Sequence, residues 1–265
     1  MSITDSTFKK FQDLVRKESG INLPDVKKNL VTSRLAKRLR HYGIESYDAY
    51  YKRVTEDSME LQMMIDLITT NETSFFREPH HFDFLKTSIL PLFKEGKCRV
   101  WSAAASIGAE AYTLAMILDE ALLPRHIVWE VVGTDINTEV IVKAKHSLYP
   151  MEHAKTIDTK YLKKYCLEGI NKFEGFFLID DHLKSNCKFF NANLMNPPLS
   201  QLGQFDVIFL RNMLIYFDHE NKKTIVENVI KSLKKGGYLF IGHSETLNKI
   251  TDHVRQIRPT IYIKD

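Results

Sequence analysis

The segment NETSFFR, residues 71–77, is the densest group of residues whose types could do chemistry. It brings an amide, a hydroxyl, two aromatic rings and a guanidinium together, and a guanidinium is well suited to hold a carboxylate. The same residues are also typical of a helix start, with Thr73 as the N-cap and Phe75 and Phe76 as core anchors. The segment alone leaves both interpretations open.

A second group of candidate binding residues follows two strand-like runs. Residues 103–108, AAASIG, precede a helical pattern, and small side chains there let a ligand approach the free N–H groups of a helix N-terminus. Asp135 ends the next run, where a doubly wound sheet places a carboxylate that binds ribose hydroxyls. Together they favour a nucleoside-containing cofactor over a plain turn. They do not distinguish NAD from S-adenosylmethionine, although no GxGxxG loop is present to hold a pyrophosphate.

Alternating strand and helix patterns must position these residues. Strands are predicted at residues 99–105, 128–136, 205–212, 236–243 and 259–265, with helices at 111–123, 138–149 and 218–236. This alternation predicts an α/β fold with a doubly wound, mostly parallel, Rossmann-like sheet. Residues from about 165 to 191 break the alternation with short β-like pieces, so we expect an inserted antiparallel β-subdomain there.

Residues 1–70 predict a small all-helical domain, with helices near 8–19, 27–42, 47–54 and 59–67. At about 100° per residue, one stripe of the second helix is apolar and forms a core face: Val31, Leu35, Leu39 and Tyr42. Basic residues gather on a neighbouring arc: Lys27, Arg34, Lys37, Arg38 and His41. Such an arc is usually solvated surface, and no aromatic-interleaved groove favours nucleic acid.

The composition excludes few classes of protein. At 265 residues and a net charge of +4, one large domain and a small companion are expected, and the charge alone does not imply nucleic acid. No apolar run approaches the roughly 20 residues that span a bilayer, and the N-terminus lacks a signal-peptide core, so we expect a cytoplasmic protein without membrane insertion. The three cysteines lack metal-ligand spacing and are expected to be reduced thiols. No metal site is predicted, because His80, His81 and His243 have no companion carboxylate at metal-ligand spacing.

Six motifs occur in the order found in the CheR family of chemotaxis receptor methyltransferases. They read TNETSFFRE, RVWSAAASIGAEAY, VVGTDINTEVIVKA, FNANL, FDVIFLRNMLIYFD and GGYLFIGHSE. The N-terminal GINLPDVKKNLVTSRLAKRLRHYGI is similar to the helical domain of that family. The resemblance implies a methyltransferase domain at 71–265 that uses S-adenosylmethionine, releases S-adenosylhomocysteine and esterifies glutamate side chains of a chemotaxis receptor.

The resemblance also implies roles for individual residues. Arg77 would lie at the reacting centre and near the methionine end of the cofactor, and Tyr216 would be an active-site tyrosine. Glu110 would bind the methionine ammonium, and Asp135 the ribose. The further cofactor-binding residues that it implies are Asn71, Thr73, Ala104, Asn193, Leu194, Arg211 and Asn212.

The helical domain, by the same resemblance, would dock on the cytoplasmic helical domain of the receptor. Cationic side chains facing the partner's glutamates would steer this encounter. The receptor-binding residues implied are Lys27, Arg34, Lys37, Arg38 and Arg40. We expect a monomer that binds no nucleic acid. The β insertion resembles a subdomain that in some members holds a receptor C-terminal peptide by strand addition, which the sequence of this chain leaves open.

The chain departs from the family in the cofactor loop, where SIGAEAY at residues 106–112 replaces the usual STGEEPY. The loss of an acid at Ala109, together with Ile107, predicts weaker cofactor binding, while Glu110 remains as the more direct contact. A catalytically weak relative that serves as a binding module is therefore a second hypothesis. A methyltransferase of another substrate class is the third.

Methyl transfer to glutamate needs no general base, because a carboxylate with a pKa of about 4.3 is already anionic at neutral pH. The expected contribution of the protein is in-line positioning in a dry pocket, where opposite charges neutralise along the reaction coordinate. We expect Arg77 to hold the acceptor carboxylate, Tyr216 to orient it, and Phe75 and Phe76 to help exclude water.

Overall fold

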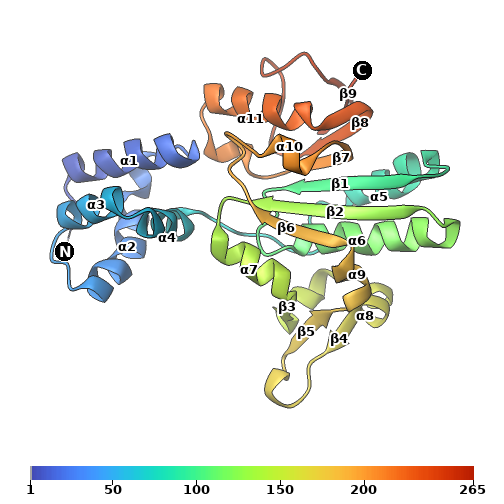
Figure 1. Ribbon diagram of the computed structural model, residues 1–265, viewed down its shortest axis with the longest axis horizontal. Helices are drawn as coiled ribbons and strands as arrows, with labels where there is room; N and C mark the ends of the chain where they lie inside the picture. Colours follow the sequence, from blue (N-terminus) through green and yellow to red (C-terminus); the bar gives the residue numbers. More distant parts are fainter. Residues whose placement is uncertain (1) are drawn as a thin grey trace.

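Four helices at the N-terminus form a bundle whose limits follow from capping residues. They are α1 (Asp5–Ser19), α2 (Lys28–Tyr42), α3 (Tyr47–Glu56) and α4 (Ser58–Ile68). The side chain of Asp57 accepts hydrogen bonds from the first turn of α4, and Gly20 and Gly43 take left-handed conformations that end α1 and α2. The structure, a computed structural model, describes residues 2–265, and Figure 1 shows this bundle beside a larger α/β part.

Three of the four residues in the apolar stripe predicted for the second helix lie in the core of the bundle, whereas Tyr42 is half-buried and donates its hydroxyl to Glu60. Val31, Leu35 and Leu39 are buried there, against Phe11 and Tyr50 of the neighbouring helices. The predicted helical domain is therefore confirmed, with helix limits within a few residues of those expected.

A seven-stranded sheet in the order β6-β2-β1-β7-β8-β10-β9 forms the centre of the α/β part. Its strands are β1 (Lys97–Ala103), β2 (Val128–Asp135), β6 (Cys187–Asn191), β7 (Phe205–Leu210), β8 (Leu233–Ile241), β9 (Arg255–Arg258) and β10 (Ile261–Ile263). Neighbours from β6 to β8 pair in parallel, whereas β10 pairs antiparallel with β8 and β9. This confirms the mostly parallel, Rossmann-like sheet.

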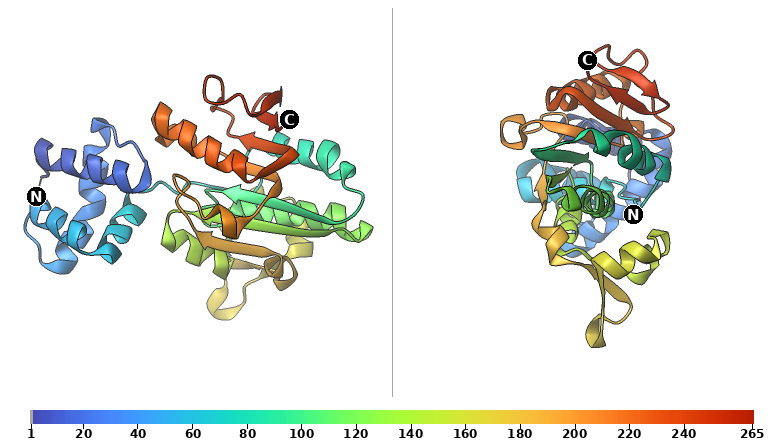
Figure 2. Two further views of the ribbon diagram at one scale, coloured as in Figure 1. Left: turned by 45° about the horizontal axis from the view of Figure 1, so that its top comes forward. Right: turned by 90° about the vertical axis from the view of Figure 1, so that its right-hand side faces the viewer.

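Apolar residues on both faces of the central strands explain why helices cover the sheet on both sides. Along β7, Val207 and Phe209 belong to one core, and Ile208 and Leu210 belong to the other. The first core packs against α6 (Ala109–Leu122) and α7 (Thr138–His146), and the second against α11 (His219–Lys231). Figure 2 shows these helices on either side of the strands.

A small antiparallel sheet projects from the α/β part, at the bottom of Figure 1. It consists of β3 (Leu148–Pro150), β5 (Phe176–Ile179) and β4 (Cys166–Glu168), with α8 (Thr159–Tyr165) and α9 (Asp181–Ser185) nearby. The insertion thus begins earlier than the expected residue 165. Residues 187–191, assigned to it from sequence, instead pair in parallel with β2 as an edge strand of the main sheet. A short edge strand with one buried residue carries too little pattern to tell the two sheets apart.

Hydrogen bonds join the helical bundle to the α/β part on two sides. Asn221 Nδ2 donates to Gly20 O at 2.8 Å, and the Thr138 N–H donates to the Asp66 carboxylate at 3.0 Å. These contacts place the bundle against the carboxyl ends of the parallel strands. Within residues 2–265, no helix is long and apolar enough to cross a membrane.

Candidate functional site

A cavity lies between the helical bundle and the carboxyl ends of the parallel strands. Ala104 follows β1, Asp135 ends β2 and Arg211 follows β7, so the parallel arrangement brings these residues to one edge of the sheet. The predicted site residues that line the cavity are Asn71, Thr73, Arg77, Ala104, Glu110, Asp135, Arg211, Asn212 and Tyr216.

The loop after β1 holds the carboxylate of Asp135 in a fixed position. Ala104 and Ser106 adopt left-handed conformations, with φ of 68° and 51°, which turn the backbone N–H of Ser106 toward β2. Asp135 Oδ2 accepts this N–H at 2.8 Å, and Oδ1 accepts the N–H of Asn137 at 3.0 Å. Burial raises the pKa of Asp135, while these N–H groups act in the opposite direction. Each oxygen retains a lone pair for a ligand hydroxyl.

Glu110, in the first turn of α6, faces the same cavity. Its Oε1 accepts a hydrogen bond from the hydroxyl of Ser102 at 2.7 Å, and its Oε2 accepts one from Arg211 Nη1 at 2.9 Å. A carboxylate held in this way is an anionic acceptor whose remaining lone pairs suit an ammonium group.

A second, smaller cavity adjoins the first and shares Ala104 and Asp135 with it. The predicted Asn193 and Leu194 line this space. Asn193 is held by Glu18 O, which accepts its Nδ2 at 2.8 Å, and by the N–H of Met195, which donates to its Oδ1 at 2.9 Å. The apolar lining suits a flat heterocycle such as adenine and consists of Ile21, Ile136, Leu194, Met213 and Phe217.

Arg77 and Tyr216 lie on the wall of the larger cavity together with Lys27 from the helical bundle. Arg77 Nη1 donates to the carbonyl of Glu72 at 3.1 Å, which leaves its other donors available. The Lys27 ammonium lies 5.1 Å from the centre of the Tyr216 ring. Two cations and a phenol therefore line the cavity.

Phe75 and Phe76 do not line the cavity, so the expectation that they exclude water from it is not supported. Phe75 is fully buried against Tyr149, and Phe76 packs between Phe82 and Tyr161. They anchor the preceding loop in the core, as the alternative interpretation held. Thr73 is not a helix cap, because the next helix, α5 (Pro79–Phe84), begins six residues later.

Besides Lys27, the predicted receptor-binding residues divide into two pairs in the structure. Arg34 Nη1 donates to the carbonyl oxygens of residues 67, 68 and 69 at the end of α4, and Arg38 makes a two-point ion pair with the buried Glu60. Lys37 and Arg40 are exposed on α2. The second pair thus presents its charge to solvent, whereas the first pair is used within the bundle.

Neither Ile107 nor Ala109 lines the cavity. Ala109 is fully buried in the core at the start of α6, and Ile107 packs against the same core. The carbonyl of Ile107 accepts the hydroxyl of Tyr149 at 2.7 Å. Within the described residues, the two altered positions therefore affect the packing of the core behind the loop, and neither belongs to the cavity wall.

Several residues of the site were not identified from the sequence. Ile21 and Leu23 reach the cavity from the loop after α1, which no local pattern indicates. Glu78 could have been suspected from the sequence, because it directly follows Arg77. Its hydrogen-bond partners Asn212 and His243, however, are distant in sequence. It accepts hydrogen bonds from Asn212 Nδ2 and His243 Nδ1, both at 2.9 Å.

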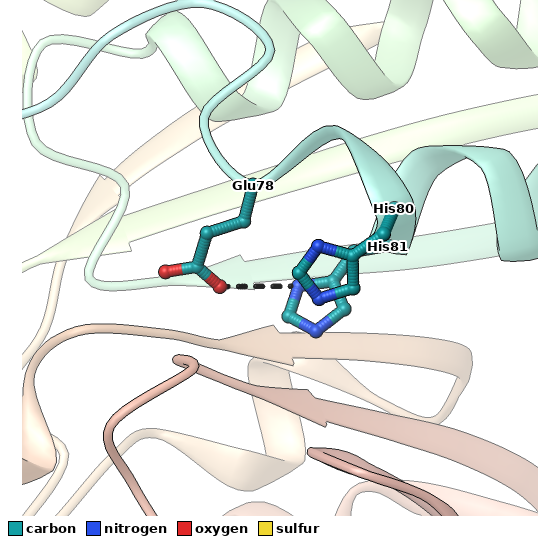
Figure 3. A group of neighbouring side chains, drawn as sticks. All are labelled: Glu78, His80 and His81. Carbon is teal, nitrogen blue, oxygen red and sulfur yellow. Dashed lines mark ion pairs between the residues drawn. The ribbon is translucent and has the colours of Figure 1, made fainter.

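The expectation that the histidines have no companion carboxylate is corrected by Glu78. Its carboxylate pairs with His243 and lies 3.4 Å from Nδ1 of the buried His81, as Figure 3 shows for the latter. Glu78 and His81 are neighbours because they lie three residues apart in the chain, whereas the fold adds His243, which follows β8.

The site combines an anion suited to an ammonium, a fixed carboxylate suited to ribose hydroxyls and an apolar slot suited to adenine. This set fits S-adenosylmethionine, and with the Rossmann-like sheet it defines a methyltransferase of the S-adenosylmethionine-dependent class.

Comparison with known proteins assigns the chain to a particular family. The model for the SAM-binding domain of CheR methyltransferases matches residues 71–263, and the model for the CheR all-alpha domain matches residues 6–69. The chemotaxis protein methyltransferases of Salmonella typhimurium and Escherichia coli are each 35% identical to it over 99% of this chain, covering 91% and 92% of their own lengths. That of Borreliella burgdorferi is 34% identical over 100% of this chain and 96% of its own. The chain belongs to the CheR methyltransferase family.

Proposed function

We propose that this protein transfers a methyl group from S-adenosylmethionine to glutamate side chains of a chemotaxis receptor, and that it acts as a cytoplasmic monomer. The observation that carries the proposal is that Arg77, Lys27 and Tyr216 all line the cofactor cavity, with the Lys27 ammonium beside the Tyr216 ring. Two cations and a hydroxyl donor are suited to an anionic acceptor and not to a neutral amine or a nucleobase.

The cofactor, when bound, supplies an electrophilic methyl group on a cationic sulfur. Glu110, Asp135 and the apolar slot between Asn193 and Phe217 would hold its ammonium, ribose and adenine ends in turn. Within these assignments, Asn71, Thr73, Ala104, Leu194, Arg211 and Asn212 complete the walls around it.

The protein's contribution to the reaction is binding and orientation. The acceptor carboxylate needs no base, because it is already ionised near neutral pH. In the proposal, Arg77 holds one oxygen of this carboxylate and Tyr216 orients the group, which leaves the second oxygen free to react. Positioning of this kind contributes up to about 7–11 kcal/mol in well-oriented systems.

The helical bundle supplies the receptor-docking surface in this proposal. Lys37 and Arg40 present exposed charge to an acidic receptor helix, and Lys27 acts at the cavity itself. Arg34 and Arg38, which the sequence assigned to the same role, would support docking by holding α2 against α4.

The deciding experiment is transfer of labelled methyl groups from S-adenosylmethionine to receptor-containing membranes, followed by mild base. We expect label on the receptor that base releases as methanol, because methyl esters hydrolyse readily. Arg77→Ala should abolish transfer while S-adenosylhomocysteine binding is only weakened. Receptor in which the candidate glutamates are replaced by alanine is the matched control. Base-stable label, or unchanged turnover in Arg77→Ala, would contradict the proposal.

A further inference from the structure

The guanidinium of Arg211 lies between two carboxylates. Its Nη1 is 2.9 Å from Glu110 Oε2, and its Nη2 is 3.2 Å from Glu78 Oε2. The Arg211 side chain is 2% exposed, and those of Glu110 and Glu78 are 13% and 10% exposed, so water screens these charges poorly. One buried cation therefore faces two anions, of which only Glu110 lines the cavity.

Glu78 is held as an anion by groups other than Arg211. Asn212 Nδ2 and His243 Nδ1 donate to its Oε1, and the N–H of His243 donates to its Oε2 at 3.2 Å. Burial raises the pKa of Glu78, but these hydrogen bonds and the Arg211 charge outweigh burial and lower it to about 2. The side chain is therefore ionised throughout the neutral range.

A metal ion bound by Glu78 is an alternative to the ion pair with Arg211, because possible ligand atoms of Glu78, His80 and His81 lie within 4.8 Å of one another (Figure 3). The oxygen of Glu78 that faces His81 is Oε2, which is also the oxygen that faces Arg211. A divalent cation bound there would lie beside a buried guanidinium, and this repulsion disfavours it. Ion pairing with Arg211 accounts for the position of Glu78 without a metal.

We propose that Glu78 is a positioning residue that neutralises Arg211 and so keeps the negative charge of Glu110 available for the ammonium group of the cofactor. With Glu78 present, the three side chains carry a net charge of −1. Without it, Arg211 and Glu110 would neutralise each other, and the ammonium would meet a site with no net charge. The inference rests on the assignment of Glu110 in the proposed function.

The test compares two ligands of the whole chain by calorimetry: S-adenosylhomocysteine, and 5′-methylthioadenosine, which lacks the amino-acid end. In Glu78→Gln, the first should bind at least about tenfold more weakly, and the second should change by less than about twofold. Equal weakening of both ligands would indicate a general distortion and overturn the proposal. No weakening of either would overturn it as well.

Two further variants keep the test decisive if Glu78→Gln folds poorly. Glu78→Asp retains the charge, so its preference for S-adenosylhomocysteine over methylthioadenosine should stay close to that of the unmodified protein. Loss of this preference in Glu78→Asp would show that charge is not the property that matters and overturn the proposal. His243→Ala, which removes an exposed partner of Glu78 but not the Arg211 pair, should also keep the preference. Failure of the Glu110 assignment is distinguishable, because the unmodified protein would then bind both ligands equally. Failure of the proposed receptor methylation is read separately, from base-stable label on the receptor.

Discussion

The Lys27 ammonium lies 5.1 Å from the centre of the Tyr216 ring, so a residue of the helical bundle and a residue of the α/β part share one wall of the cavity. The backbone supports this approach, because the N–H of Asn22 donates to the carbonyl of Tyr216 at 2.8 Å. The bundle therefore contributes a charge to the site itself as well as an outer surface.

Replacement of Lys27 by methionine should lower kcat/KM for the receptor by about tenfold, because an acceptor carboxylate loses a cation beside Tyr216. The affinity for S-adenosylhomocysteine, measured by calorimetry, should be nearly unchanged, and Lys27→Arg should restore most of the activity. Lys28→Met is the matched control, since the neighbouring Lys28 pairs with Asp5 within the bundle. Equal effects of the Lys27 and Lys28 substitutions would refute a role for Lys27 at the site.

Charge reversal of Lys37 and Arg40 should raise KM for the receptor more than it lowers kcat. Both side chains are exposed on α2, so they can attract an acidic partner without supporting the fold. The effect should shrink as salt is added, because exposed charges are screened at higher ionic strength. A KM that does not respond to these substitutions or to salt would exclude this face as the docking surface.

Arg38→Met should lower the stability of the fold, which distinguishes Arg38 from the exposed Lys37 and Arg40. Its ion pair with Glu60, which is 2% exposed, would be broken and leave a buried carboxylate, at a cost of about 3 kcal/mol in the free energy of unfolding. Urea unfolding measures this loss. An unchanged stability would indicate that Arg38 is as free as Lys37.

How far the sequence predicts this molecule depends on the range of the interactions involved. The strands and helices follow local periodicity, and the ends of parallel strands meet at one edge by topology, which is why the loop at residues 103–108 and Asp135 could be grouped in advance. Arg211 was added to them only through the family resemblance. Glu78 and His243 are 165 residues apart, and no local pattern indicates that they bond. The same limit applies to Arg38, whose helical position fits a cationic surface, but whose partner Glu60 is set by the packing of α2 against α4.

Ala109→Glu, which introduces the acid usual in the family motif, should destabilise this protein and not strengthen cofactor binding. Ala109 is fully buried and does not line the cavity, so an added carboxylate would need to displace core atoms or remain unpaired, at a cost of about 1–3 kcal/mol. Thermal unfolding and S-adenosylhomocysteine calorimetry together check this. Ile107→Thr, at the other altered position, is a control that should leave cofactor affinity nearly unchanged and lower stability less, because Ile107 is only partly buried against the core. A stable Ala109→Glu protein with tighter binding would instead support the expectation that the altered loop weakens cofactor binding.

His81 should make the fold sensitive to mild acid. Its side chain is fully buried, and burial, followed by the nearby charge of Arg211, lowers its pKa to about 3. In the unfolded chain the pKa is near 6.5, so below that pH the unfolded state binds a proton that the folded state does not. Stability therefore falls as the pH decreases from about 6.5 toward 3, by about 2 kcal/mol at pH 5.

His81→Gln removes this titration, so the difference in the free energy of unfolding between pH 7.5 and pH 5 should shrink by about 2 kcal/mol relative to the unmodified protein. Glu78 does not contribute to the pH dependence in this window. Its pKa is lowered from 4.5 to about 2 on folding, so the stability that it adds is fully present above about pH 4.5 and decreases only below that pH. Urea unfolding at the two pH values measures the difference, with the exposed neighbour His80→Gln as the control. If His81→Gln keeps the full pH dependence, a different group must bind the proton on unfolding, and the assignment to His81 fails.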